Sequence, residues 1–119
     1  MDYDGHYCVT FNRTKFNDTW IIKWDLYDQN VSKLGNNNET ASDLSTCAHS
    51  AFFNVKQTVD RLDVKFLTFV TNWEYLIDAV YSKGEIEDFV KYFKELFLGY
   101  NYIVLNVFDT EIINQFYSN

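Results

Sequence analysis

The sequence predicts an α/β (α+β) domain in which a five-stranded mixed sheet is flanked by helices. Two observations predict this class: three β-rich segments follow one another at the start of the chain, and strands alternate with helices after them. Meandering strands followed by strand–helix alternation are typical of a mixed sheet covered by helices. The expected order is β-β-β-α-β-α-α-β-α, in a single domain that spans residues 1–119.

The first part of the chain predicts an antiparallel hairpin and one further strand. Residues 6–12 (HYCVTFN) and 18–27 (DTWIIKWDLY) are rich in β-forming residues, and the polar residues 13–17 between them are turn-like. A short third strand is expected at 31–34. The Asn-rich residues 35–40 (GNNNET) are turn-formers, so we expect a loop there.

A long helix is expected after Asp43, which is a suitable N-cap, because apolar residues recur at helical spacing from 44 to 62. Residues 64–70 then predict a buried strand, followed by a turn at Thr71 and Asn72 and a helix that opens at Trp73. Asn72 is also a good N-cap residue, and we expect it to cap this helix.

The remaining elements are another helix, a strand and a short last helix. Gly84 suits the left-handed position after the preceding helix. Helical spacing predicts a helix over 85–98, a buried strand follows at 100–108, and Asp109 is expected to cap a final helix over 110–118.

Composition limits the class of function. The chain carries a formal charge of −7, and its ten Lys and Arg residues are spread without a cluster, which argues against broad binding of nucleic acid. Cys8 and Cys47 lie in apolar surroundings without metal-ligand spacing, so we expect buried free thiols. No apolar run is long enough to span a membrane, and we expect a soluble, intracellular protein.

Four segments together resemble the ribonuclease H fold across essentially the whole chain. VTFNRTKFNDTWIIKWDLYDQNVSKLG looks like the first hairpin of that family, in which a strand ends in Asp-Gly-Ser. GNNNETASDLSTCAHSAFFNV looks like the Asn-rich loop that runs into a small-residue helix carrying a Glu. VKFLTFVTNWEYLIDAV is similar to the strand ending in Thr-Asp-Ser, and IVLNVFDTEIINQFYSN to the last strand and helix.

This resemblance implies hydrolysis of the RNA strand of an RNA–DNA hybrid by two divalent cations, which three or four converging carboxylates hold. Mg²⁺ requires oxygen ligands and is held poorly by neutral amides alone. The positions of the family's four carboxylates fall here on Asn12, on Asp43 (less well on Glu39), on Asn72 and near Phe116, and the Gly after the first falls on Arg13. Because two acids have become amides and one an aromatic residue, we expect no catalytic or metal site.

Alternatives remain open for several of these residues. Asp43 and Asp109 could retain a cation and a weak hydrolytic activity, whereas Asp43 as a helix cap is the simpler interpretation. Asn12 and Asn72 are either remnants of a binding site or ordinary structural residues. Residues Asn36, Asn37 and Asn38 could contact a ribose 2′-hydroxyl, as the Asn-rich loop of the family does, or form a solvated loop.

The functional hypothesis is a non-catalytic, ribonuclease H-like interaction module without a cofactor; Mg²⁺ is expected only if hydrolysis survives. Trp and Tyr are more numerous than a small core can hide, and such an excess is typical of protein interfaces, so a protein partner is favoured. Candidate binding residues are Asn36, Asn37, Asn38, Asn72 and Asp109. The alternatives are binding of RNA or hybrid by a catalytically dead groove that includes Lys15, or weak metal-dependent ribonuclease activity. The oligomeric state is left open.

Overall fold

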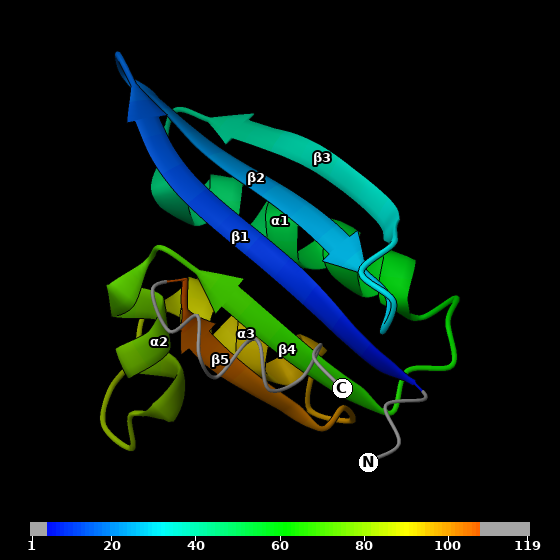
Figure 1. The fold of residues 1–119 in the computed structure, drawn as a ribbon. Helices are drawn as coiled ribbons and strands as arrows, with labels where there is room; N and C mark the ends of the chain where they lie inside the picture. The colour runs from blue at the N-terminus through cyan, green and yellow to red at the C-terminus, as the bar shows by residue number, and fades with distance from the viewer. Residues whose placement is uncertain (1–4, 108–119) are drawn as a thin grey trace.

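The computed structural model describes residues 5–107, which form a five-stranded sheet with three helices (Figure 1). The strands are β1 (His6–Phe16), β2 (Thr19–Tyr27), β3 (Lys33–Ala41), β4 (Phe66–Thr71) and β5 (Tyr102–Asn106). The helices are α1 (Leu44–Val59), α2 (Glu74–Tyr81) and α3 (Asp88–Leu96). The final helix predicted at 110–118 lies outside the described residues.

The sheet is mixed, and its strands lie in the order β3-β2-β1-β4-β5. β1 pairs with β2, and β2 with β3, in antiparallel fashion; β1 pairs with β4, and β4 with β5, in parallel. Each parallel pair is joined by a connection that contains helix, as parallel neighbours require. The predicted fold class and element order are therefore confirmed over the described part of the chain.

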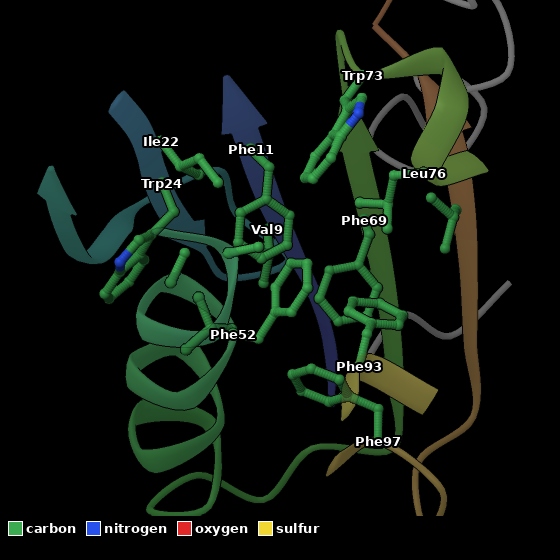
Figure 2. Close-up of a cluster of buried hydrophobic side chains, with 14 of the residues drawn as sticks. Val9, Phe11, Ile22, Trp24, Phe52, Phe69, Trp73, Leu76, Phe93 and Phe97 are labelled. Carbon is green, nitrogen blue, oxygen red and sulfur yellow. The ribbon is translucent and has the colours of Figure 1, made fainter. Parts of the chain in front are cut away.

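Aromatic side chains fill the space between the sheet and the helices α1 and α3 (Figure 2). Phe52 from α1 and Phe69 from β4 both contact the ring of Phe93 from α3, each with ring centroids 5.0 Å apart. Phe97, just after α3, lies 4.9 Å from Phe69. Such edge-to-face contacts add to the free energy of burial itself. These rings belong to a single core of buried side chains.

β1 and β3 are longer than the sequence predicts. β1 continues through the polar residues that were expected to turn, and the turn is instead at Asn17 and Asp18, where Asn17 has a φ of 55°. The predicted loop at 35–40 is also wrong, because these residues belong to β3 and pair with β2 along their whole length. Tertiary pairing overrides the low β-propensity of Asn and Gly here.

The helices are shorter than the periodicity predicts, and the residues that cap or end them differ from the predicted ones. α1 ends at Val59 and α3 begins at Asp88, although the apolar pattern extends beyond both. The N-cap of α2 is Trp73, without a side-chain hydrogen bond, so the expected capping by Asn72 is wrong. Gly84 does not take the left-handed conformation either; among the described glycines only Gly5 has a positive φ.

A tight turn connects β2 and β3 and places a β-branched residue in an unfavourable conformation. Val31 has a φ of 62°, in the left-handed region that favours glycine. The turn is held by Asp28, whose Oδ1 accepts hydrogen bonds from the backbone N–H groups of Asn30 and Ser32, both at 2.9 Å. These bonds oppose the strain at Val31.

Cys8 and Cys47 are both buried, as predicted. Within residues 5–107, no helix is long and apolar enough to cross a membrane.

Candidate functional site

The candidate site lies where the parallel strands β4 and β5 end beside β1, which continues past them to Phe16. Phe11 of β1 pairs with Thr71 of β4, and Thr71 also pairs with Asn106 of β5. Ligands of open α/β sheets usually bind beyond the carboxyl ends of such strands. Asn12, Asn72 and Asn106 stand at this margin, and we call these three residues the asparagine rim. The sequence placed Asn12 and Asn72 here but overlooked Asn106, because β5 was expected to run on to residue 108.

Asn72 uses both atoms of its amide to hold the neighbouring strand. Its Oδ1 accepts a hydrogen bond of 2.8 Å from the backbone N–H of Arg13, and its Nδ2 donates one of 3.0 Å to the carbonyl of Arg13. The side chain thereby extends the parallel pairing of β4 and β1 by one residue. An aspartate could accept the first bond but could not donate the second.

Arg13 brings a positive charge next to the rim. Its guanidinium lies between two indole rings, 5.1 Å from the centroid of Trp20 and 5.2 Å from that of Trp73. Lys15, two residues along the same face of β1, lies 5.0 Å from the Trp20 ring. Cations over indole faces are held by the ring quadrupole.

The sequence did not predict a cluster of cations, yet the structure joins Arg13 and Lys15 over one ring. The sequence spacing of Arg13 and Lys15 does indicate this cluster. The two cations are separated by two residues on a strand, and the hairpin pairs Lys15 directly with Trp20. The cluster was not predicted because the turn was expected to begin at residue 13, whereas it begins at Asn17.

Asp43 is the N-cap of α1, as the simpler interpretation predicts. Its carboxylate accepts hydrogen bonds from the backbone N–H groups of Ser45 (3.1 Å) and Thr46 (3.2 Å), and from the Thr46 hydroxyl. The bond from the Thr46 hydroxyl, followed by those from the two backbone groups, lowers the pKa of Asp43. Its oxygens are therefore committed to the helix end rather than to the rim.

Glu39, the weaker candidate for the helix carboxylate, is a structural residue. It lies on β3 with 9% of its surface exposed, and its Oε2 accepts hydrogen bonds from three side chains. The donors are Trp24 Nε1 (2.9 Å), Asn54 Nδ2 (2.9 Å) and Asn37 Nδ2 (3.1 Å). Three charge-assisted bonds of this kind compensate for burying the carboxylate.

The three central asparagines of β3 lie apart from the rim. Asn36 and Asn38 are exposed, and Asn38 shares a row with Lys23 and Asn12, because Lys23 pairs with both. Asn37 points to the opposite face and contacts Glu39. The structure therefore aligns Asn38 with Asn12 across the sheet, at a separation of two strands.

The described residues do not fit a pair of divalent cations. Among residues 5–107, no three His, Cys, Asp or Glu side chains lie together as a metal site requires. The rim offers neutral amides and has a guanidinium close by, and two-metal chemistry requires several carboxylates. Asp109 and Phe116 lie outside the described residues.

A hollow of about 210 Å³ borders the rim between α2 and β5. It is lined by Glu74, Ile77, Asp78, Val104, Leu105 and Asn106. Asn106 Nδ2 lies 3.5 Å from Glu74 Oε1, so the polar end of this hollow is the end that touches the rim.

Comparison with known proteins identifies the fold. No family model matches the chain, and no curated protein matches it. Three solved structures are similar over most of its length. RNase H1 of the archaeon Halobacterium salinarum is 10% identical with a TM-score of 0.65, covering 87% of this chain and 86% of that one.

Two further structures give the same result. The N-terminal RNase H domain of a Mycobacterium tuberculosis protein is 4% identical with a TM-score of 0.68, covering 85% of each chain. LC11-RNase H1, solved in complex with an RNA/DNA hybrid, is 9% identical with a TM-score of 0.67, covering 84% and 83%. The chain therefore has a ribonuclease H-like fold, and the resemblance seen in its sequence is confirmed.

Proposed function

We propose that this chain is a non-catalytic ribonuclease H-like domain that binds another macromolecule, with a protein as the favoured partner. The observation that carries this proposal is the bonding of Asn72. Its amide oxygen and its amide nitrogen both form hydrogen bonds with the Arg13 backbone, so this side chain supports strand pairing. As a neutral amide it has no negative charge to offer a cation. The Arg13 guanidinium adds a positive charge close to the same margin, which disfavours a bound divalent cation.

The surface best suited to a partner is the end of the β1–β2 hairpin, which extends past the start of α1 (Figure 1). We define the hairpin patch as four residues at the tip of this hairpin: Arg13, Lys15 and Trp20 on one face of the sheet, and Phe16 on the opposite face. Phe16 is 71% exposed, more than the other strongly exposed aromatic side chains of the described residues, Phe53, Tyr75 and Tyr81. Aromatic residues together with Arg are the residues that most often dominate protein interfaces. The patch is basic in a chain with a net charge of −7, so its partner should present acidic groups.

A chemical test separates this proposal from surviving hydrolysis. The purified chain is incubated with a labelled RNA–DNA hybrid and Mg²⁺ or Mn²⁺, and we expect no cleavage. Cleavage that disappears in Asp43→Ala would establish the nuclease and refute the proposal.

The binding test uses a pair of matched variants. The full chain is immobilised and exposed to extract from its native source, and the proteins retained by wild type, Phe16→Ser and Leu98→Ser are compared. Leu98 is the control, because it is 84% exposed but lies at the end of α3, away from the hairpin. We expect Phe16→Ser alone to lose the partner. Retention that is equal in all three, or absent in all three, would contradict a protein-binding hairpin.

The second candidate is binding of single-stranded nucleic acid, which one observation favours. Arg13 and Lys15 lie over Trp20, and aromatic rings beside cations are the elements that bind bases and phosphates of single strands. Binding of a labelled oligonucleotide should then weaken with salt and with Lys15→Glu, but not with Lys83→Glu, an equal charge change at an exposed site after α2. The absence of binding at low salt would exclude this candidate.

A further inference from the structure

The two margins of the sheet differ in how they are protected. At the β5 margin, the backbone N–H of Val104 donates a hydrogen bond of 2.8 Å to the hydroxyl of Tyr81. This side chain from α2 occupies the position that an added strand would need. At the other margin, β3 pairs with β2 alone among the described strands, and no described segment is drawn beyond it (Figure 1).

The usual protection against pairing lies at the ends of β3 and not at its centre. Natural edge strands are kept short or carry charges, prolines or bulges that prevent another strand from adding. β3 is nine residues long and the chain contains no proline, and the one bulge of the strand is at Leu34, where the register with β2 shifts. Of its two charged residues, Glu39 is turned into the interior and Lys33 lies 3.1 Å from Asp25. The centre of the strand, from residue 34 to 38, is uncharged.

We propose that β3 pairs in antiparallel fashion with the β3 of a second copy of this chain, about a two-fold axis at Asn37. Asn37 is the central residue of Lys33–Ala41, so this register pairs residues 35–39, which follow the bulge at Leu34, with the same residues of the other copy. Asn36 of one copy then faces Asn38 of the other, and amide side chains satisfy one another because each both donates and accepts. Pairing over this length forms on the order of five backbone hydrogen bonds.

Charge favours a second copy at this place. Two chains with a net charge of −7 repel each other, and the repulsion is weakest where both surfaces are neutral. A two-fold contact of this kind is isologous and closed. Because the Tyr81 hydroxyl accepts a hydrogen bond from the Val104 N–H at the β5 margin, this margin of the described sheet is less open to an added strand, and we expect the assembly to stop at two chains.

The experiment measures mass in solution for wild type and two double variants. Asn36→Lys with Asn38→Lys places like charges opposite each other across the axis, whereas Asn36→Lys with Asn38→Glu places opposite charges there. The second variant is also compatible with β2, where Asn36 pairs with Asp25 and Asn38 with Lys23. Sedimentation velocity is recorded from about 10 μM to about 1 mM. Circular dichroism melts verify that each variant is folded.

We expect wild type to reach twice the 14.2 kDa of one chain as its concentration rises. The Lys/Lys variant should dimerise about tenfold more weakly, and the Lys/Glu variant at least as well as wild type. A chain that stays monomeric throughout, or a dimer that the Lys/Lys variant leaves intact, overturns the proposal.

A covalent readout tests the register independently of affinity. Residues that face each other across antiparallel strands have Cα atoms roughly 4.5–5.5 Å apart, which a disulfide can span. Asn37→Cys should therefore form a disulfide-linked dimer under mild oxidation, and Ser50→Cys, exposed on α1, should not. Cys8 and Cys47 are buried and do not compete. Equal crosslinking of both variants would contradict the two-fold axis at Asn37.

Discussion

Replacing Asn72 by aspartate tests directly what this side chain does. The substitution keeps the shape and the acceptor that binds the Arg13 N–H at 2.8 Å, but it removes the Nδ2 donor that binds the Arg13 carbonyl at 3.0 Å. A lost hydrogen bond costs about 1 kcal/mol, and placing a carboxylate oxygen against the carbonyl oxygen adds to that cost. We therefore expect Asn72→Asp to lower the free energy of unfolding by about 1–2 kcal/mol.

The measurement is thermal and urea denaturation followed by circular dichroism. For a domain of this size, the expected loss corresponds to a fall in Tm of about 4 °C per kcal/mol. Asn12→Asp is the matched control, because Asn12 is exposed on the adjacent strand, opposite Lys23, and should change stability by less than about 0.5 kcal/mol. If Asn72 acted as a helix cap instead, aspartate would serve as well as asparagine. An Asn72→Asp chain as stable as Asn12→Asp would refute the proposed role in strand pairing.

Three further predictions concern stability. Val31→Gly should raise the free energy of unfolding by about 1 kcal/mol, because glycine relieves the left-handed φ of 62°; chemical denaturation measures this, and no gain would contradict strain at Val31. Glu39→Leu should lower it by about 3 kcal/mol, because the indole N–H of Trp24 and two amides lose their acceptor, whereas Glu39→Gln should cost less; equal losses would contradict this. Burial, and then the hydrogen bond to Asp60, raises the pKa of Tyr100 from 10.0 to about 12. The proton on Tyr100 therefore stabilises the fold fully below about pH 10, and this contribution disappears as the pH rises to 12. In melts across this range Tyr100→Phe should lose less stability than wild type, and parallel losses would exclude the effect.

The elements that could be predicted are those whose apolar pattern is strong. The helical spacing within α1 and the mainly apolar residues of β4 predict that both elements lie in the core, because their apolar side chains must be buried. β3 could not be predicted in the same way, since its residues Gly35–Asn38 favour turns. β3 is a strand because β2 offers backbone hydrogen-bond partners along it. In addition, the buried carboxylate of Glu39 accepts a hydrogen bond from the indole N–H of Trp24 on β2, which holds β3 against the sheet.

In the candidate site, the positions of residues could be predicted from the sequence, but their contacts could not. The positions of Asn12 and Asn72 followed from the ends of two apolar strands, and Asp43 followed from the start of the helix. The bonding between Asn72 and Arg13 joins residues 59 positions apart, and neither residue carries a local signal of it. Likewise, Trp73 was predicted to begin a helix, but its contact with Arg13 depends on the distance between two strands, which no pattern within one segment encodes.

The position of Arg13 between two indoles also means that intrinsic tryptophan fluorescence can detect contacts made by the hairpin patch. The chain has three tryptophans: Trp24 and Trp73 are buried, and only Trp20 lies in the hairpin patch. Tryptophan emission depends on nearby charge and on access of water to the ring. Anything that draws Arg13 or Lys15 away from Trp20, or covers the ring, would therefore change the intrinsic fluorescence of Trp20 while Trp24 stays constant. Engagement of the hairpin can thus be followed in unlabelled protein, and a Trp20→Phe chain separates the signal of Trp20 from that of Trp73, which also contacts Arg13.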